Sequence, residues 1–119
     1  MERVVHGRSR KMIRLSVALQ VSPRYVEDLL KAFRFLMLAT RLESGCLGCT
    51  VWADPDSTVR YEEEWATEAD IRRRIQSERF TSILSVIEAA QTPPRVQFDF
   101  VTTTRGLDYV AEVRQETLS

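Results

Sequence analysis

Apolar and polar residues alternate along two stretches of the chain, residues 13–21 near the start and residues 95–103 near the end. A period of two is typical of β-strands with one buried face. Two further strands are expected at residues 46–53 and 58–65, because the sequence between them, residues 54–57, is a cluster of turn-forming residues. The middle of the chain is therefore predicted to form an antiparallel hairpin.

The residues after the first strand indicate a helix. Ser22 is the expected N-cap, and Pro23 suits the first helical position, where no backbone N–H is needed. The apolar residues that follow recur at helical spacing and predict a stripe facing the core: Val26, Leu29, Leu30, Phe33 and Met37. Other apolar residues of this helix exceed what one sheet requires, and they indicate a pocket or a subunit interface: Phe35, Leu36 and Leu38.

The segment between the third and fourth strands is expected to hold two short helices. Thr67 and Asp70 have the spacing of a weak capping box and mark the start of the first. Ser77 is the expected N-cap of the second, whose predicted buried face consists of Phe80, Ile83, Leu84 and Ile87. The order strand, helix, strand, strand, helix, strand predicts an α+β fold, a ferredoxin-like βαββαβ unit with an antiparallel sheet and helices on one face.

A chain of 119 residues has room for one domain, which we expect to span residues 12–103. Residues 1–11 are rich in arginine and are interpreted as a basic N-terminal tail. Residues 104–119 contain apolar residues at helical spacing. They are interpreted as a C-terminal arm with a short helix that lies on the domain or on a partner subunit.

Acidic and basic residues number 17 each, so the net charge is zero and gives no reason to expect binding to nucleic acid or to an acidic membrane. The sequence also lacks an apolar run near the ~20 residues that span a bilayer, and we expect a cytoplasmic protein. The two cysteines, Cys46 and Cys49, are then expected to be thiols. Although they match C-x-x-C, they begin a strand, so we expect them on opposite faces as structural residues.

The only histidine is His6, in the expected tail. A serine–histidine or cysteine–histidine pair and a histidine metal site are therefore not expected in the domain. Glycine-rich phosphate loops are absent from the sequence as well, since none of the four glycines falls in a GxGxxG pattern. The sequence therefore predicts neither a cofactor nor a metal ion.

Four short motifs lie between residues 43 and 80: Glu43-Ser44-Gly45-Cys46, Glu63-Glu64-Trp65, Glu68-Ala69 and Ser77-Glu78-Arg79-Phe80. Together they resemble the antibiotic biosynthesis monooxygenase family of dimeric α+β barrels, and the resemblance extends over residues 12–103. It implies a homodimer in which two sheets pack together through the face away from the helices. That face is predicted to present both signs of charge, from Arg14, Ser16, Gln20, Arg60, Glu62, Glu64, Arg95, Gln97 and Asp99. A solvated face is the alternative.

The resemblance also implies a function: a cofactor-independent monooxygenase that acts on a polyaromatic phenol or quinol with O2, the substrate itself supplying the electrons. Its haem-degrading branch uses an asparagine, an aromatic residue and a histidine where this chain has Val17, Arg74 and Leu84, so haem degradation is not expected. The alternative function is a non-catalytic dimeric module that binds a small aromatic ligand or a partner protein. An open pocket with convergent polar groups would favour the enzyme, and a filled core would favour the module.

Six residues are candidates for the site that the resemblance implies. Trp65 and Tyr61 would stack on the substrate ring, and two residues of the first helix, Phe33 and Met37, would form a wall of the pocket. Arg74 stands where the family usually has a histidine, and it is the candidate to stabilise a substrate oxygen.

The last candidate, Glu63, is a possible base if burial disfavours its charged form. We rank a structural ion pair with an arginine of a neighbouring strand above that role. Core packing is likewise the alternative for Trp65. Arg72 and Arg73 are interpreted as solvated residues of a helix face.

Overall fold

Four strands form one antiparallel sheet in the structure, a computed structural model that describes residues 11–90, 92–102 and 107–118. The strands are β1 (Lys11–Gln20), β2 (Cys46–Ala53), β3 (Thr58–Trp65) and β4 (Arg95–Thr102). They lie in the order β2-β3-β1-β4, and each neighbouring pair is antiparallel. This arrangement confirms the predicted ferredoxin-like α+β fold.

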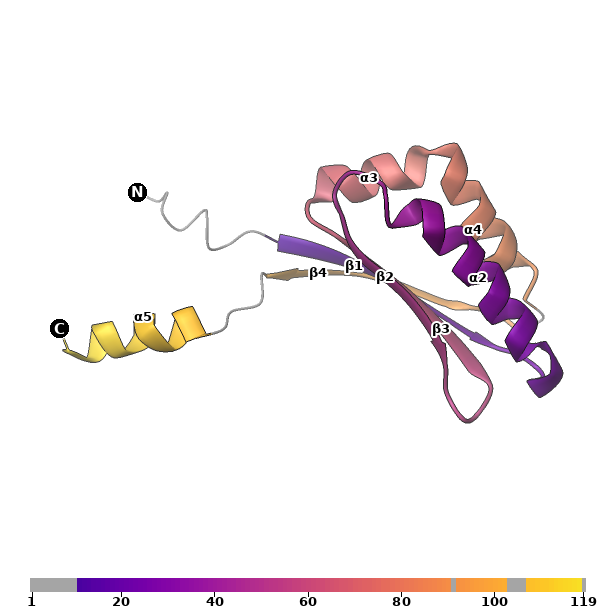
Figure 1. The fold of residues 1–119 in the computed structure, drawn as a ribbon, viewed down its shortest axis with the longest axis horizontal. Helices are drawn as coiled ribbons and strands as arrows, with labels where there is room; N and C mark the ends of the chain where they lie inside the picture. The colour runs from indigo at the N-terminus through magenta and orange to yellow at the C-terminus, as the bar shows by residue number, and fades with distance from the viewer. Residues whose placement is uncertain (1–10, 91, 103–106, 119) are drawn as a thin grey trace.

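Helices cover one face of the sheet (Figure 1). A 3-10 turn, η1 (Pro23–Tyr25), leads into α2 (Val26–Thr40), and α3 (Glu68–Gln76) and α4 (Glu78–Glu88) connect β3 to β4. The predicted C-terminal helix is present as α5 (Leu107–Leu118), which lies beyond the end of β4 and away from the other helices (Figure 1).

The core lies between the sheet and these helices. Every second residue of β1 is at most 2% exposed, as its alternation predicts: Ile13, Leu15, Val17 and Leu19. Their Cα partners on β3 are also buried: Trp65, Glu63, Tyr61 and Val59. The helices contribute buried apolar side chains to this core: Leu30, Phe33, Met37, Phe80, Ile83 and Ile87. The predicted helical stripes therefore face the sheet.

Leu84 is an exception to the predicted core, because its side chain is 41% exposed. The helix starts also differ in detail from the prediction. The Thr67 hydroxyl accepts the backbone N–H of Asp70, as in the predicted cap. The side chains of Ser22 and Ser77, however, make no capping hydrogen bond, although both residues occupy N-cap positions. The Ser77 hydroxyl instead donates to the carbonyl of Arg74 at the end of α3.

Gly45 shapes the entry into β2. Its φ of 88° lies in the left-handed region, and a Cβ there would collide with the carboxyl group of Asp70. A β-bulge follows between Cys46 and Gly48. Because of this extra residue, Cys46 pairs with Trp65 and Cys49 with Glu63, two residues of β3 that share the buried face. The prediction that the two cysteines point to opposite faces is therefore wrong.

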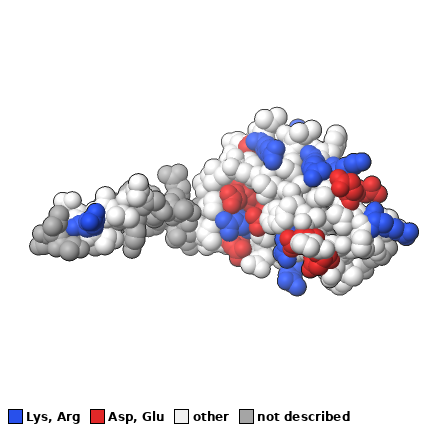
Figure 2. Space-filling view, turned by 60° about the horizontal axis from the view of Figure 1, so that its bottom comes forward, with Lys and Arg blue, Asp and Glu red and all other residues white. Residues whose placement is uncertain are grey.

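The opposite face of the sheet carries the predicted mixture of charges. Arg14 pairs in register with Glu64 on one side and Asp99 on the other. Its Nη2 lies 3.1 Å from the carboxylate of Glu64. Figure 2 shows acidic and basic side chains intermixed over the surface in view, rather than separated by sign.

Two predictions fall partly outside the described residues. Of the expected basic tail, residues 1–11, only Lys11 is described, and it is the first residue of β1. The arm expected at residues 104–119 is described from residue 107 to residue 118. Among the described residues, no helix has the length and apolar character needed to cross a membrane.

Candidate functional site

Glu63 is the centre of a buried polar cluster between β3, α2 and α3. The side chain is fully buried, and its Oε1 accepts hydrogen bonds from Trp65 Nε1 at 2.9 Å and from Arg74 Nε at 3.2 Å. Its Oε2 accepts from Arg74 Nη2 at 2.8 Å and from the Tyr61 hydroxyl. Both oxygens of this carboxylate are thus occupied by donors of the protein itself.

Arg74 connects this carboxylate to the end of α2. Its Nη1 donates to Glu43 at 2.8 Å, and its Nη2 donates to the hydroxyl of Thr40 at 3.0 Å. The guanidinium also lies near the ring of Trp65, with 5.8 Å between its Cζ and the ring centroid. Arg74 is 2% exposed and donates four hydrogen bonds to other side chains of the chain. It therefore connects α3, β3 and the end of α2.

Three side chains in and beside the cluster, Arg74, Tyr61 and Cys49, have raised pKa values. Burial alone would lower the pKa of the Arg74 guanidinium, but the hydrogen bond and the charge of Glu63 outweigh that effect and raise it. Burial, reinforced by the charge of Glu63, raises the pKa of Tyr61 far above its usual range. Burial also raises the pKa of the Cys49 thiol to about 11. The cluster is therefore suited to holding the fold rather than to exchanging protons with a substrate.

The structure brings the six predicted site residues together in the interior. The ring of Phe33 stacks on that of Tyr61 with 4.6 Å between centroids, and Met37 is 6% exposed. Glu63 does form the ion pair that we ranked first, but its partner is Arg74 of α3 and not an arginine of a neighbouring strand. The roles of these residues toward a substrate stay predictions.

The neighbours of Arg74 on α3 behave as the sequence predicts. Arg72 and Arg73 have side chains that are 70% and 60% exposed, and they pair on the helix surface with Glu68 and Asp70. They form a solvated face, so the buried Arg74 is the one arginine of this run that belongs to the core.

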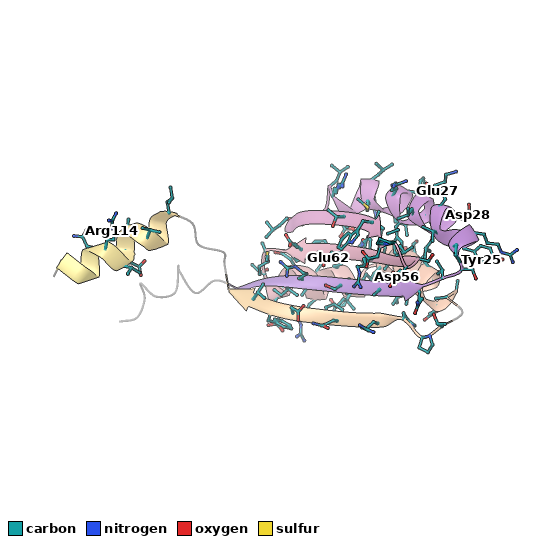
Figure 3. The ribbon with its side chains drawn as sticks, turned by 90° about the horizontal axis from the view of Figure 1, so that it is seen from below. Tyr25, Glu27, Asp28, Asp56, Glu62 and Arg114 are labelled. Atoms are coloured by element: carbon teal, nitrogen blue, oxygen red, sulfur yellow. The ribbon has the colours of Figure 1, made fainter. Side chains whose placement is uncertain are left out.

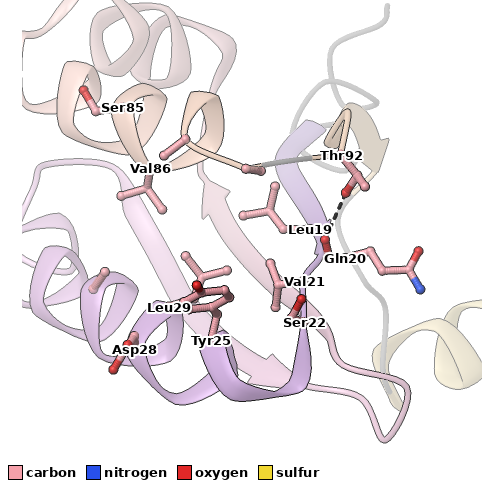
Figure 4. A pocket seen from close by; sticks show the side chains of 13 residues that line it. Leu19, Gln20, Val21, Ser22, Tyr25, Asp28, Leu29, Ser85, Val86 and Thr92 are labelled. Carbon is pink, nitrogen blue, oxygen red and sulfur yellow. Dashed lines mark hydrogen bonds between the residues drawn. The ribbon is translucent and has the colours of Figure 1, made fainter.

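A cavity of about 730 Å³ opens at the other end of the core, between the start of α2, the end of α4 and the end of β1 (Figure 4). It is lined by Leu19, Gln20, Val21, Ser22, Tyr25, Asp28, Leu29, Ala32, Ser85, Val86, Ala89, Ala90 and Thr92. Neither Arg74 nor any other predicted site residue is among these. The cavity and the buried cluster are thus two separate places in the domain.

The cavity is lined by both apolar and polar side chains. Leu19, Leu29 and Val86 form its inner surface (Figure 4). The Tyr25 hydroxyl accepts a hydrogen bond of 2.9 Å from Arg24, whose guanidinium also lies over the tyrosine ring. Walls of this kind with a few polar groups, in a cavity of this size, are usual for small-molecule sites.

Sequence reasoning missed this cavity. Its clearest signal is the presence of small residues on both sides of the cavity, namely Ala32 on α2 and Ala89 and Ala90 directly after the end of α4. Small side chains leave space that larger ones would fill. In the sequence these alanines are inconspicuous, because their effect depends on the separation of two helices.

A second, smaller cavity of about 230 Å³ lies near the end of α2. The surplus apolar residues Phe35, Leu36 and Leu38 contribute to its lining, together with Arg74. Phe35 and Leu38 remain 74% and 65% exposed. These residues therefore border this cavity and also present apolar surface to the outside.

Within the described part of the chain, no three histidine, cysteine or acidic residues lie close enough together to hold a metal ion. Both cysteines are free thiols.

Comparison with known proteins gives a family match. The sequence model described as antibiotic biosynthesis monooxygenase matches residues 12–84. A comparison with curated protein sequences finds no significant match.

Several solved structures share the fold. A conserved protein from Methanosarcina mazei Go1 is 23% identical with a TM-score of 0.67, covering 79% of this chain and 96% of its own. An antibiotic biosynthesis monooxygenase is 20% identical with a TM-score of 0.61, covering 73% and 95%. The protein PA3566 from Pseudomonas aeruginosa is 24% identical with a TM-score of 0.62, covering 82% and 98%. At these identities the similarity establishes the fold.

Proposed function

Because the chain belongs to the antibiotic biosynthesis monooxygenase family, we propose that it is a monooxygenase that oxidises a polyaromatic phenol or quinol with O2, without a cofactor. The site of this reaction is the cavity between α2, α4 and β1. The observation that carries the proposal is the volume of about 730 Å³ behind apolar walls, which is suitable for a planar multi-ring molecule.

The substrate supplies the electrons for this reaction. A dihydroquinone gives up four electrons and two protons to O2, so that one oxygen atom bonds to a ring carbon and the other leaves as water. The protein contributes apolar walls, because Leu19, Leu29 and Val86 would lie against the reacting carbon and limit its contact with water. Tyr25 and Asp28 provide a hydroxyl and a carboxylate with which substrate hydroxyl groups can form hydrogen bonds.

In this proposal the cluster around Glu63 supports the site from a distance. Arg74 fixes Thr40 and Glu43, at and just after the C-terminal end of α2, to β3. Asp28 and Leu29 are in the N-terminal half of the same helix, and Tyr25 lies directly before it. All three residues line the cavity. The cluster therefore keeps one wall of the cavity in place, and it is not expected to touch the substrate.

The proposal includes a homodimer formed through the sheet face away from the helices. Supporting it is the balance of charge on that face, where Arg14 already pairs with Glu64. Charges of both signs can neutralise one another when two such faces meet, whereas charge of one sign would repel.

A second candidate function is a module that binds an aromatic ligand without reaction. Among the residues lining the cavity, only Tyr25 and Asp28 have ionisable side chains, and neither residue is buried. A cavity without a buried base favours binding over catalysis, since a phenol must lose a proton before it reacts readily with oxygen.

Oxygen uptake decides between these functions. The purified protein is mixed with dihydroquinones and anthrone-like phenols in the presence of a metal chelator, and O2 consumption is followed with an electrode. The proposal predicts uptake above autoxidation, with one atom of labelled oxygen from O2 in the product. Ligand binding without uptake establishes the module instead. If the protein shows no binding and no uptake, both functions are contradicted.

A further inference from the structure

An apolar strip on β4 lies uncovered on the helix side of the sheet. Val96, Phe98 and Phe100 pair in register with Val17, Leu15 and Ile13 of β1, so they share the face that the helices cover elsewhere. Their β1 partners are at most 2% exposed, whereas the three β4 residues are 45%, 38% and 51% exposed. Since β4 is the last strand of the described sheet, no further strand shields this edge.

Leu84 of α4 adds to this strip from the helix layer. It lies two residues before Val86, which faces α2 across the cavity, and two residues correspond to about 160° around a helix. Leu84 therefore points away from α2. Because α2 packs over β2 and β3, that side of α4 is the side of β4. Leu84 and the three β4 residues are called the β4 strip below, and its large apolar side chains indicate an interaction surface.

The helix α5 has apolar residues of its own and lies apart from the strip. The radius of gyration is 17.9 Å, compared with about 13 Å for a compact chain of this length. In Figure 3, Arg114 of α5 lies at the opposite end of the molecule from Tyr25 and Asp28. Leu107 and Val110 share one face of α5 with Ala111, and they are 84% and 47% exposed.

We propose that α5 of one chain packs on the β4 strip of a second copy, and that the second copy returns the same contact. The lengths match, because the 12 residues of α5 extend about 18 Å and the strip from Val96 to Phe100 extends about 13 Å. Two such contacts cover on the order of 1,000 Å², which is the lower end for a specific interface.

Symmetry explains why the arm points outward. In a two-fold dimer each chain gives one arm and receives one, so both apolar surfaces are covered and the assembly closes. The contact involves the helix side of β4 and is therefore distinct from the sheet-face contact proposed above. It also does not depend on catalysis, since neither α5 nor the β4 strip lines the cavity.

Cross-linking between different chains tests the exchange. Full-length chains with Val110→Cys are mixed with full-length chains of a different mass that carry Phe98→Cys, and the mixture is oxidised mildly. The exchange predicts a covalent dimer that contains one chain of each kind. Lys31→Cys in place of Phe98→Cys is the matched control, because Lys31 is exposed on α2 and should give no product. Wild-type chains, oxidised in the same way, show whether Cys46 and Cys49 form cross-links by themselves.

A second variant keeps the test independent of disulfide geometry. Leu107→Glu/Val110→Glu alters two exposed residues, so the domain should fold normally. The dimer dissociation constant measured by analytical ultracentrifugation should rise at least about tenfold, and hydrogen exchange in β4 should accelerate. An unchanged dissociation constant overturns the proposal. So does a disulfide that forms only within single chains of a Val110→Cys/Phe98→Cys double variant, which would show that α5 covers its own strip.

Discussion

Replacing Arg74 with methionine removes the centre of the buried cluster while retaining much of its volume. Glu63 would lose two hydrogen bonds, from Nε and Nη2, and its fully buried carboxylate would keep only the donors of Tyr61 and Trp65. Glu43 and Thr40 would each lose one partner. Breaking a buried ion pair from one side typically costs about 3–5 kcal/mol, a large part of the ~5–15 kcal/mol that stabilises a domain.

The double variant Arg74→Met/Glu63→Gln isolates the buried charge as the cause. It removes both ions, so most of the loss should be recovered, because well-packed neutral replacements of buried pairs are often close to neutral in stability. Arg73→Met is the matched control on the same helix. Arg73 is 60% exposed in its pair with Asp70, so its replacement should cost less than about 1 kcal/mol.

Urea unfolding at pH 7, followed by circular dichroism, measures the free energy of unfolding of these variants. The reasoning is refuted if Arg74→Met is as stable as Arg73→Met, or if the double variant is as unstable as Arg74→Met alone. Oxygen uptake adds a functional readout. Per folded molecule, it should be retained in the double variant if the cluster is structural, and it should be lost if Arg74 or Glu63 acts on the substrate.

Two further predictions concern backbone strain and pH. Gly45→Ala should destabilise the protein by about 1–3 kcal/mol in thermal unfolding, because it combines a positive φ with a collision against Asp70. Gly48→Ala, whose Cβ meets only Glu64 at an ordinary 3.8 Å, should not. Since the pKa of Cys49 is about 11 in the folded state and about 8.5 in an unfolded chain, the unfolded state loses its proton first. Titration of this thiol should therefore lower the free energy of unfolding by roughly 2–3 kcal/mol between pH 9 and 11. Since the pKa of Tyr61 is raised as well, the tyrosine adds to the fall above pH 10, and Cys49→Val should remove only the contribution of the thiol in a series of unfolding curves.

The strands and helices could be predicted because their signals are local. The alternation in β1 and the turn before β3 depend on residues close in sequence, and the boundaries of β2 and β3 agree with the prediction. The helical spacing of Leu84 from Phe80 and Ile87 predicts a place in the core. Its exposure depends on where the sheet ends relative to α4, which spacing along one helix does not contain.

The candidate site was predicted only in part, for a similar reason. Tyr61, Glu63 and Trp65 lie together in the core because they are on one face of β3. The partner of Glu63 depends on how α3 crosses the sheet, so Arg74 could not be chosen over a strand arginine from spacing alone. The shared face of the cysteines depends on a bulge, and the cavity depends on the separation of α2 and α4.

Oxygen uptake by a variant with a filled cavity is the most direct measurement of where the reaction takes place. Ala32→Trp places a large ring among the lining residues of α2. Lys31→Trp adds the same ring at the preceding residue, which is exposed and does not line the cavity. If the cavity is the site, uptake with a dihydroquinone falls to the autoxidation rate in Ala32→Trp and stays at the wild-type rate in Lys31→Trp, with both variants folded by circular dichroism. Wild-type uptake in a folded Ala32→Trp protein would show that the substrate binds elsewhere.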